Sequence, residues 1–288
     1  MRHAFMLAAL LAGCGGATAP AKPVLKFTAI PGDRTTELRE KFAPFAKHLS
    51  ERLGVQVEYV PTADYSASVD AFANGQVHLA WFGGLTGVRA AQAVPGARAI
   101  AQGKVDPNYH SYFIVNKATG IEPGEGFPTA LGGRKFTFGS ESSTSGRLMP
   151  EFFIRKHTGK SPKEFFGWEM SFSGNHEKTA ELVQAGTFDG GAIDYKTYDR
   201  LVAEKKIDPA VCRVVWKTAP YPDYHWMAHP DLDKLCGAGF TEKLQAAMVA
   251  ITDAKLLEAV NRKEGLIPAK NEDWNVLRDL ARELGLVR

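Results

Sequence analysis

A run of hydroxyl side chains, Ser142-Ser143-Thr144-Ser145-Gly146, stands between a predicted strand and a predicted helix. The N-terminus of a helix carries unpaired N–H groups and about half an elementary positive charge. Amide and hydroxyl donors that converge there can hold several oxygens of one anion without a full cation. The simpler interpretation is a helix cap, for which one hydroxyl is enough. Four hydroxyl residues exceed that need, so the segment predicts a site for a tetrahedral oxyanion.

Three other polar residues could reach the same ligand. His176 lies at a second predicted junction of loop and helix, where an imidazole can donate to an oxyanion. Asp194 follows a predicted strand, and Asp223 lies in an aromatic segment, Tyr221-Pro222-Asp223-Tyr224-His225-Trp226. Each also has a plainer interpretation: a surface or capping histidine, an N-cap aspartate and a turn aspartate.

The two aspartates bear on the charge of the ligand. A buried carboxylate repels an oxyanion unless a proton or an ammonium group lies between them. If Asp194 or Asp223 touches the ligand, the ligand must be a protonated oxyanion or carry an amine. If neither does, a fully ionised dianion such as selenate or sulfate fits the hydroxyl-rich site. The sequence leaves both alternatives open.

Catalytic motifs are scarce. Ser143 or Ser145 with His176 could be read as a hydrolase pair, but the G-x-S-x-G elbow and the S-x-x-K motif are both missing. The chain has no H-E-x-x-H metal motif and no G-x-G-x-x-G or P-loop phosphate cradle. We therefore expect a binding protein that is not an enzyme and that uses no cofactor and no metal.

Strands and helices alternate along the chain, which is typical of an α/β fold with mostly parallel sheets and a ligand at the carboxyl ends of the strands. Hydrophobic periodicity predicts strands over 24–30, 55–61, 77–82, 97–102, 111–116, 135–139, 167–171, 188–193 and 213–218. It predicts helices over 35–54, 65–74, 86–94, 147–157, 176–185, 195–204, 241–251, 255–262 and 274–286. The pattern restarts midway, so we expect lobe 1 over 24–116 and 218–288 and lobe 2 over 117–217.

The N-terminus predicts export. Arg2 precedes a short apolar stretch, which is typical of a secretory signal over residues 1–13 and is too short to span a bilayer. Leu11-Ala12-Gly13-Cys14 resembles a lipobox, so Cys14 is the expected lipidation site and residues 14–23 the expected tether. The alternative is an ordinary signal peptide cleaved between Cys14 and Ala21. Both place the protein in the periplasm, and the lipobox also anchors it to a membrane.

Only Cys212 and Cys236 remain after Cys14. In an oxidising compartment they could form a disulfide or stay as two separate thiols, and spacing alone leaves both open.

Composition excludes several classes of protein. The chain has 288 residues, of which 44% are hydrophobic and 23% charged, so it is neither disordered nor fibrous. Lys plus Arg is 35 and Asp plus Glu is 32, a net charge of +3 that is too balanced for nucleic-acid binding. A soluble, two-lobed monomer is the expected form.

Several segments together carry a family resemblance. They are Pro31 with Thr36-Glu37-Leu38, Leu79-Ala80-Trp81-Phe82-Gly83-Gly84, Ser143-Thr144-Ser145-Gly146-Arg147-Leu148-Met149-Pro150, Ser173-Gly174-Asn175-His176 and Pro220-Tyr221-Pro222-Asp223-Tyr224. With them the chain resembles the periplasmic substrate-binding proteins of phosphonate, phosphite and related oxyanion ABC importers. Within that family it is most similar to the branch labelled as selenate-binding proteins.

The resemblance implies a two-lobed type II periplasmic-binding fold with two interlobe crossovers. It also implies a set of ligand-binding residues: Ser143, Thr144, Ser145, His176, Tyr65, Tyr109, Asp194 and Asp223. The chain departs from the family at Asp223, where Tyr224, His225 and Trp226 are expected to crowd the position. That departure favours a small, compact oxyanion over an aminoalkylphosphonate.

The expected function is capture of phosphite, phosphonate, phosphate or a selenate-like anion between the lobes, for delivery to an ABC permease in the inner membrane. The alternative is an oxyanion-sensing periplasmic partner of a histidine kinase, which could share this fold and this site.

Overall fold

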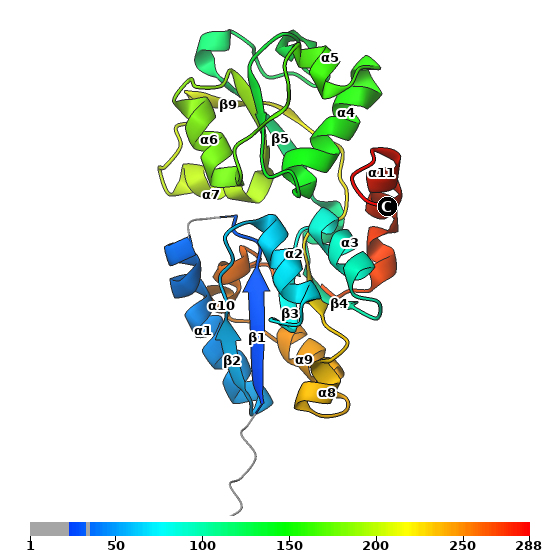
Figure 1. The fold of residues 1–288 in the computed structure, drawn as a ribbon. Coiled ribbons are helices and arrows are strands. Elements are labelled where there is room, and N and C mark those ends of the chain that lie inside the picture. Colours follow the sequence, from blue (N-terminus) through cyan, green and yellow to red (C-terminus); the bar gives the residue numbers. More distant parts are fainter. Residues whose placement is uncertain (1–22, 33–34) are drawn as a thin grey trace, which may run out of the picture.

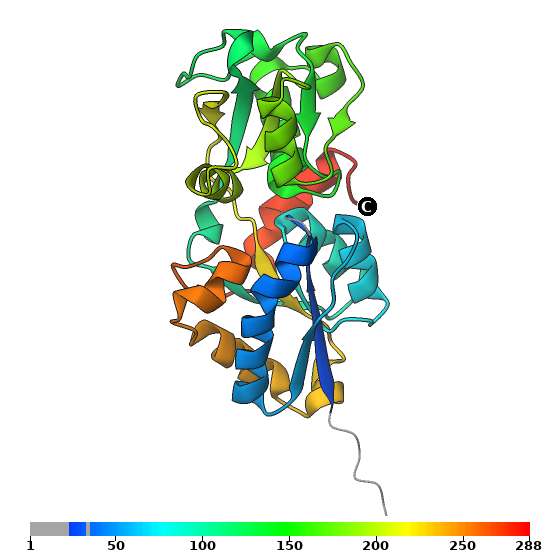
Figure 2. The same ribbon diagram turned by 90° about the vertical axis from the view of Figure 1, so that its left-hand side faces the viewer.

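Each lobe is built around its own β-sheet, with helices packed against it (Figures 1 and 2). The structure is a computed structural model that describes residues 23–32 and 35–288. The expected signal segment, most of the expected tether and Cys14 lie outside the described residues.

Lobe 1 holds a sheet with the order β11-β4-β10-β3-β1-β2. The strands β1, β2 and β3 are parallel, whereas β10 runs antiparallel between β3 and β4. The strands are β1 (Val24–Ala29), β2 (Gln56–Tyr59), β3 (Leu79–Phe82), β4 (Arg98–Gly103), β10 (His225–Ala228) and β11 (Leu266–Pro268). The helices are α1 (Thr35–Leu53), α2 (Tyr65–Ala73), α3 (Gly84–Ala93), α8 (Leu232–Cys236), α9 (Phe240–Val249), α10 (Ala254–Leu257) and α11 (Asn275–Glu283).

Lobe 2 holds the second sheet, in the order β7-β6-β8-β5-β9. Its strands are β5 (Ser111–Asn116), β6 (Phe136–Phe138), β7 (Ser171–Phe172), β8 (Gly190–Asp194) and β9 (Cys212–Lys217). Its helices are α4 (Met149–Thr158), α5 (Pro162–Phe166), α6 (His176–Gln184) and α7 (Tyr195–Ala203). Both sheets are mixed, because β5 is antiparallel to β8 and β9 in lobe 2, and β10 and β11 are antiparallel to their neighbours in lobe 1. The other strands of each sheet run in one direction, so the prediction of mostly parallel sheets is confirmed.

The lobe boundaries differ from those expected. Strand β5 pairs with β8 and β9, so it belongs to lobe 2, although the sequence analysis assigned it to lobe 1. The first crossover therefore lies between β4 and β5 rather than near residues 115–118. The second lies between β9 and β10, and β10 returns to the first sheet. The prediction missed β10 because its aromatic segment was interpreted as a loop.

The core of lobe 1 explains why α1 forms where the hydrophobic period predicts it. Its apolar residues Leu38, Phe42, Phe45, Leu49 and Leu53 are all buried against the sheet. Trp226 of β10 stacks on Phe45 with ring centroids 5.3 Å apart, and Phe27 of β1 packs edge-on against both. This aromatic cluster fixes β10 in the middle of the sheet.

The cysteines do not form a disulfide in this structure. Cys212 begins β9 in lobe 2 and Cys236 ends α8 in lobe 1, so the two thiols lie in different lobes. Burial raises the pKa of the Cys212 thiol to about 12. Of the two alternatives, the structure shows separate thiols.

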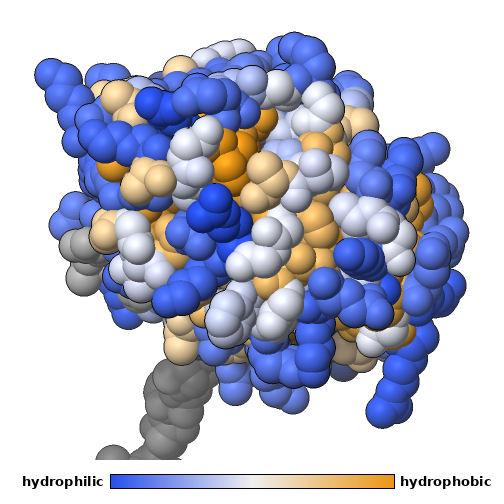
Figure 3. Space-filling model, turned by 90° about the horizontal axis from the view of Figure 1, so that it is seen from above, coloured by the Kyte–Doolittle hydropathy of each residue, from blue (hydrophilic) through white to orange (hydrophobic). Residues whose placement is uncertain are grey.

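Hydrophilic residues cover most of the face seen from above, with hydrophobic residues between them (Figure 3). Among the described residues, the large exposed apolar side chains are Trp168, Leu235 and Val276, and they are scattered over both lobes. Scattered residues of this kind do not make an interaction patch. None of the helices in the described part of the chain has the length and apolar character needed to cross a membrane.

A buried ion pair holds the start of the first crossover. Asp106 accepts hydrogen bonds from Arg262 Nε at 3.0 Å and 2.8 Å, from Arg262 Nη2 at 2.7 Å and from the Gly103 N–H at 2.7 Å. A Cβ at Gly103 would lie 2.5 Å from both Arg262 Cδ and Asp106 Oδ2, so only glycine leaves room for the pair. The two crossovers also pair through backbone hydrogen bonds between Tyr109 and Tyr221.

We expect Gly103→Ala to lower the free energy of unfolding by about 1–3 kcal/mol, because the added methyl group must displace a locked ion pair. Urea unfolding followed by circular dichroism measures the change. Gly124→Ala is the matched control, since a Cβ there would meet no atom within 4 Å. Equal stability of the two variants would contradict the described packing around Asp106.

Candidate functional site

The lobes meet where several helices begin. Helices α2 and α3 start at this junction in lobe 1, and α4 with its preceding turn, α6 and α7 start there in lobe 2 (Figure 1). Contacts between the lobes fix this arrangement: the Leu85 N–H donates to Thr144 Oγ1 at 2.9 Å, and the Ser66 and Ser142 hydroxyls lie 3.1 Å apart. Helix N-termini carry partial positive charge, so their convergence favours negative charge at this junction.

The hydroxyl segment begins its helix with a π-helical turn (Thr144–Leu148) rather than with the predicted start at Arg147. Ser143 is the N-cap, and its Oγ accepts from the Gly146 N–H at 2.9 Å. The Leu148 N–H donates to Ser143 O at 3.0 Å. This bond spans five residues, whereas the backbone bonds of an α-helix span four. The capping interpretation therefore holds for Ser143, but it accounts for only one of the hydroxyls.

All eight predicted ligand residues are buried, with at most 2% of each exposed: Tyr65, Tyr109, Ser143, Thr144, Ser145, His176, Asp194 and Asp223. All of them except Tyr65 are linked to one another by contacts around the hydroxyl segment. Tyr65 starts α2, beside Ser66, which contacts Ser142 across the junction. The structure thus brings the predicted residues together.

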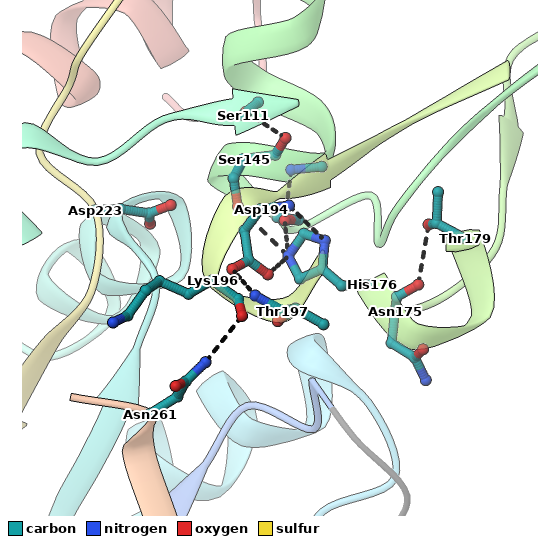
Figure 4. A network of polar contacts seen from close by, with 12 residues as sticks. Ser111, Ser145, Asn175, His176, Thr179, Asp194, Lys196, Thr197, Asp223 and Asn261 are labelled. Atoms are coloured by element: carbon teal, nitrogen blue, oxygen red, sulfur yellow. Dashed lines mark hydrogen bonds and ion pairs between the residues drawn. The ribbon is translucent and has the colours of Figure 1, made fainter. Parts of the chain in front are cut away.

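His176 lies under the hydroxyl segment as the first residue of α6 (Figure 4). Its Nδ1 faces the backbone N–H of Asp194 at 3.4 Å, which places the proton of a neutral ring on Nε2. Nε2 lies 3.5 Å from Ser143 Oγ, 3.4 Å from Ser145 Oγ and 3.5 Å from Asp194 Oδ2. A Cβ at Gly146 would lie 3.1 Å from the ring, so glycine lets the imidazole approach the helix start.

Asp194 is the N-cap of α7, as its plainer interpretation predicted, but it also reaches the site. Its Oδ1 accepts from the Tyr109 hydroxyl at 2.6 Å and from the Thr197 N–H at 2.9 Å. Burial alone would raise the pKa of Asp194, but His176, Thr197 and Tyr109 together hold it below its ordinary value. Asp194 is therefore ionised at neutral pH, and its Oδ2 accepts no hydrogen bond within the described structure.

Asp223 faces the same place from the second crossover. Its Oδ1 accepts from the Gly84 N–H of α3 at 2.9 Å, and its buried Oδ2 has no partner among the described residues. Burial raises the pKa of Asp223 to about 7, and the hydrogen bonds from Gly84 and Thr144 only partly oppose this effect. Asp223 therefore carries a proton below about pH 7, while Asp194 stays charged.

The expected crowding at Asp223 is only partly right. Tyr224 lies beside the cleft, with its ring stacked on Trp81 at 5.6 Å. His225 and Trp226 instead belong to β10, where His225 contacts Trp274 and Trp226 contacts Phe45. One aromatic side chain rather than three narrows this side of the site.

A cavity of about 60 Å³ lies beside the hydroxyl segment, between the lobes. Tyr109 and Asp194 line it with Trp81, Tyr224 and Arg262, whereas Ser143, Thr144 and Ser145 do not. Ligand pockets for drug-sized molecules usually measure roughly 300–1,000 Å³, so this space suits only a small ligand. The described residues contain no cluster of His, Cys, Asp and Glu that could hold a metal ion.

Sequence reasoning missed two features of the site. Helix α3 begins at Gly84 with Gly83 as N-cap, not at Thr86, whose hydroxyl instead donates to Gly83 O. A Cβ at Gly83 would lie 3.2 Å from Asp223 Oδ1 and 3.3 Å from Thr144 Oγ1, and the Gly-Gly pair was the available signal for such close approach.

Arg262 is the second missed feature. Its guanidinium faces the rings of Tyr109 and Tyr224 at 4.9 and 4.8 Å, and nothing in the charged sequence around Arg262 indicated these contacts.

Comparison with known proteins gives a consistent result. Residues 27–274 match the family described as the periplasmic substrate-binding protein of phosphonate ABC transporters. A probable ABC transporter phosphite-binding protein, PhnD1 of Prochlorococcus marinus, is 36% identical over 92% of this chain and 91% of its own. The phosphate-import protein PhnD of Mycolicibacterium smegmatis is 28% identical over 97% of this chain and 94% of its own.

A solved structure extends the likeness to three dimensions. PhnD1 from Prochlorococcus marinus in complex with methylphosphonate superimposes with a TM-score of 0.86 at 35% identity, covering 92% of this chain and 99% of that one. The two-lobed architecture is therefore the type II periplasmic-binding fold.

The raised pKa of Asp223 predicts a pH-dependent stability. The carboxyl binds its proton more tightly in the folded than in the unfolded chain, so folding takes up a proton between about pH 4 and about pH 7. Over that window the contribution of Asp223 to the free energy of unfolding falls as the pH rises. Between about pH 5 and about pH 7, we expect the free energy of unfolding of Asp223→Asn to rise by about 2 kcal/mol relative to that of wild type.

Urea unfolding at several pH values measures this difference. Asp70→Asn, on the exposed side of α2, is the matched control. A constant difference between wild type and Asp223→Asn would show that Asp223 is ionised throughout.

Proposed function

The chain belongs to the family of periplasmic substrate-binding proteins of phosphonate ABC transporters, and we propose that it captures a small phosphorus oxyanion between its lobes and delivers it to a membrane permease. Phosphite and simple phosphonates are the proposed ligands. One observation carries this proposal: buried hydroxyls and helix N-termini of both lobes converge on two buried carboxylates, each with one oxygen that accepts no hydrogen bond from the described residues. The relatives that bind phosphite, phosphate and methylphosphonate support the same ligand class.

The two carboxylates narrow the chemistry of the ligand. Ionised Asp194 accepts a hydrogen bond, so a ligand beside its Oδ2 must present a proton. Protonated Asp223 can itself donate to an anionic oxygen. A phosphite or phosphonate monoanion offers one P–OH donor and further P–O acceptors, which satisfies both. Sulfate and selenate are fully ionised at neutral pH and would repel Asp194, so the site favours phosphorus oxyanions over a selenate-like ligand.

The same geometry supports a role without catalysis. In a serine–histidine–aspartate triad the serine and the aspartate lie at opposite nitrogens of the ring. Here Ser143, Ser145 and Asp194 Oδ2 all lie near Nε2 of His176, and Nδ1 faces a backbone N–H. The carboxylate therefore cannot orient the imidazole as a base for either serine.

The proposal extends to location and assembly. The lipobox-like segment ending at Cys14 supports lipid anchoring at the membrane that holds the permease. The candidate site is built from one chain, which supports a monomeric binding unit.

Calorimetric titration tests the ligand class. We expect phosphite and methylphosphonate to bind, and sulfate and selenate to bind more weakly or not at all, because only the phosphorus anions carry a proton for Asp194. Phosphate, arsenite and a phenylphosphonate too large for the site complete the panel. Absence of binding by phosphite, phosphate and every phosphonate would contradict the proposed function.

Thr144→Val tests the hydroxyl segment. We expect phosphite to bind about 1–3 kcal/mol more weakly, because the variant keeps the β-branched shape but loses a buried hydroxyl. Thr187→Val, on the exposed surface of lobe 2, is the matched control and should bind as wild type does. Unchanged affinity of Thr144→Val would place the ligand elsewhere.

A further inference from the structure

A short segment of lobe 1 reaches across the junction to α7 of lobe 2. The Asn261 side-chain amide donates to the backbone oxygen of Lys196 at 3.1 Å (Figure 4). Three residues later, Glu264 forms an ion pair with the Lys196 ammonium group. Both interactions join residues of different lobes, so opening of the cleft must break them.

The segment is anchored at its centre. The Arg262 guanidinium is buried, holds Asp106 through Nε and Nη2, and donates from Nη1 to the backbone oxygens of Val260 and Asn261 at 3.1 and 3.0 Å. These bonds fix the backbone on both sides of Asn261, which has a left-handed conformation with φ of 52°. Asparagine tolerates this conformation better than most residues, and its amide is held towards lobe 2.

The helix that the segment contacts carries a residue of the candidate site. Lys196 is the second residue of α7, and Asp194 is the N-cap of that helix. Tyr109, which donates to Asp194, also packs its ring over the Arg262 guanidinium. Contacts that hold the first turn of α7 therefore also hold the Asp194 carboxylate at the junction.

We propose that Asn261 and Glu264 are positioning residues for ligand retention: they hold the first turn of α7, and with it Asp194, against lobe 1 when the lobes are closed. We call this pair the α7 latch. The inference rests on the proposed function, because retention concerns the ligand of that site. The latch touches no ligand and acts through α7, on the stability of the closed arrangement.

Another ion pair between the lobes is less suited to this role. Lys206 of lobe 2 lies 3.5 Å from Glu37 of α1, but it also lies 3.4 Å from Glu177 and 3.2 Å from Glu204 of its own lobe. Opening the cleft would leave Lys206 with those two partners. Lys196 also attracts Asp199 of its own helix, but among the described residues its ion pair is with Glu264 of lobe 1, and that pair is lost when the cleft opens.

Glu264→Gln distinguishes the proposed latch from a long-range effect of the Glu264 charge on ligand binding. Removal of a negative charge near an anion site should strengthen binding if the long-range field dominates. If the latch operates, the same change should speed dissociation of phosphite by about two- to fivefold, the range expected for a partly exposed ion pair. Stopped-flow tryptophan fluorescence measures the rate. Glu242→Gln is the matched control, because Glu242 pairs with Arg98 within lobe 1.

Asn261→Gly tests the other half of the latch. Glycine accepts the left-handed backbone, so the variant loses the amide donor without adding strain. We expect dissociation of phosphite to accelerate about two- to tenfold, with an association rate close to that of wild type. Dissociation rates of both latch variants equal to those of wild type and Glu242→Gln would overturn the proposal.

A measurement on the ligand-free protein tests the α7 latch independently of the proposed ligand-binding function. Spin labels on the outer surfaces of the two lobes report the distribution of distances between them in the ligand-free protein. We expect Glu264→Gln and Asn261→Gly to shift this distribution towards longer distances, and Glu242→Gln to leave it unchanged. If wild type bound neither phosphite nor methylphosphonate, the proposed function would fail. Unchanged distances in both latch variants would still count against the latch.

Discussion

Helix N-termini and hydroxyl groups can replace lysine and arginine in holding an anion only if they are buried together, because water screens their partial charges. This protein meets the condition by closing two lobes on one another. Thr144 of lobe 2 accepts from the first turn of α3 in lobe 1, and Asp223 accepts from the same turn. The site therefore exists as a single environment only when the lobes are in contact, which links capture of a ligand to closure.

Burial raises the pKa of both carboxylates at this junction, and their neighbours make the outcomes differ. Asp194 has three nearby groups that favour its charged form, so it stays ionised. For Asp223, burial outweighs the hydrogen bonds from Gly84 and Thr144, two nearby aspartates add to the effect, and the pKa rises to about 7. One acceptor and one donor thus lie near each other at the junction of the lobes. A partly protonated oxyanion complements that pair, which is why charge rather than size alone accounts for the proposed preference.

Most of the site could be predicted from local sequence, and the missed parts share one cause. Ser143, His176 and Asp194 follow strands and begin helices, so strand and helix periods were enough to place them at one edge. Strand β5 was assigned to the wrong lobe, and β10 was missed, because pairing between distant segments leaves no local signal. Arg262 was missed for the same reason, since its partner Asp106 lies 156 residues away.

The most direct test of the account is a crystal structure of the protein with phosphite bound. We expect the phosphorus atom to lie between the 143–145 segment and the Gly83–Gly84 turn. Asp194 Oδ2 and Asp223 Oδ2 should each lie within hydrogen-bond distance of a phosphite oxygen. An anion bound instead in the neighbouring cavity, against Arg200 and away from the serine hydroxyls, would contradict it.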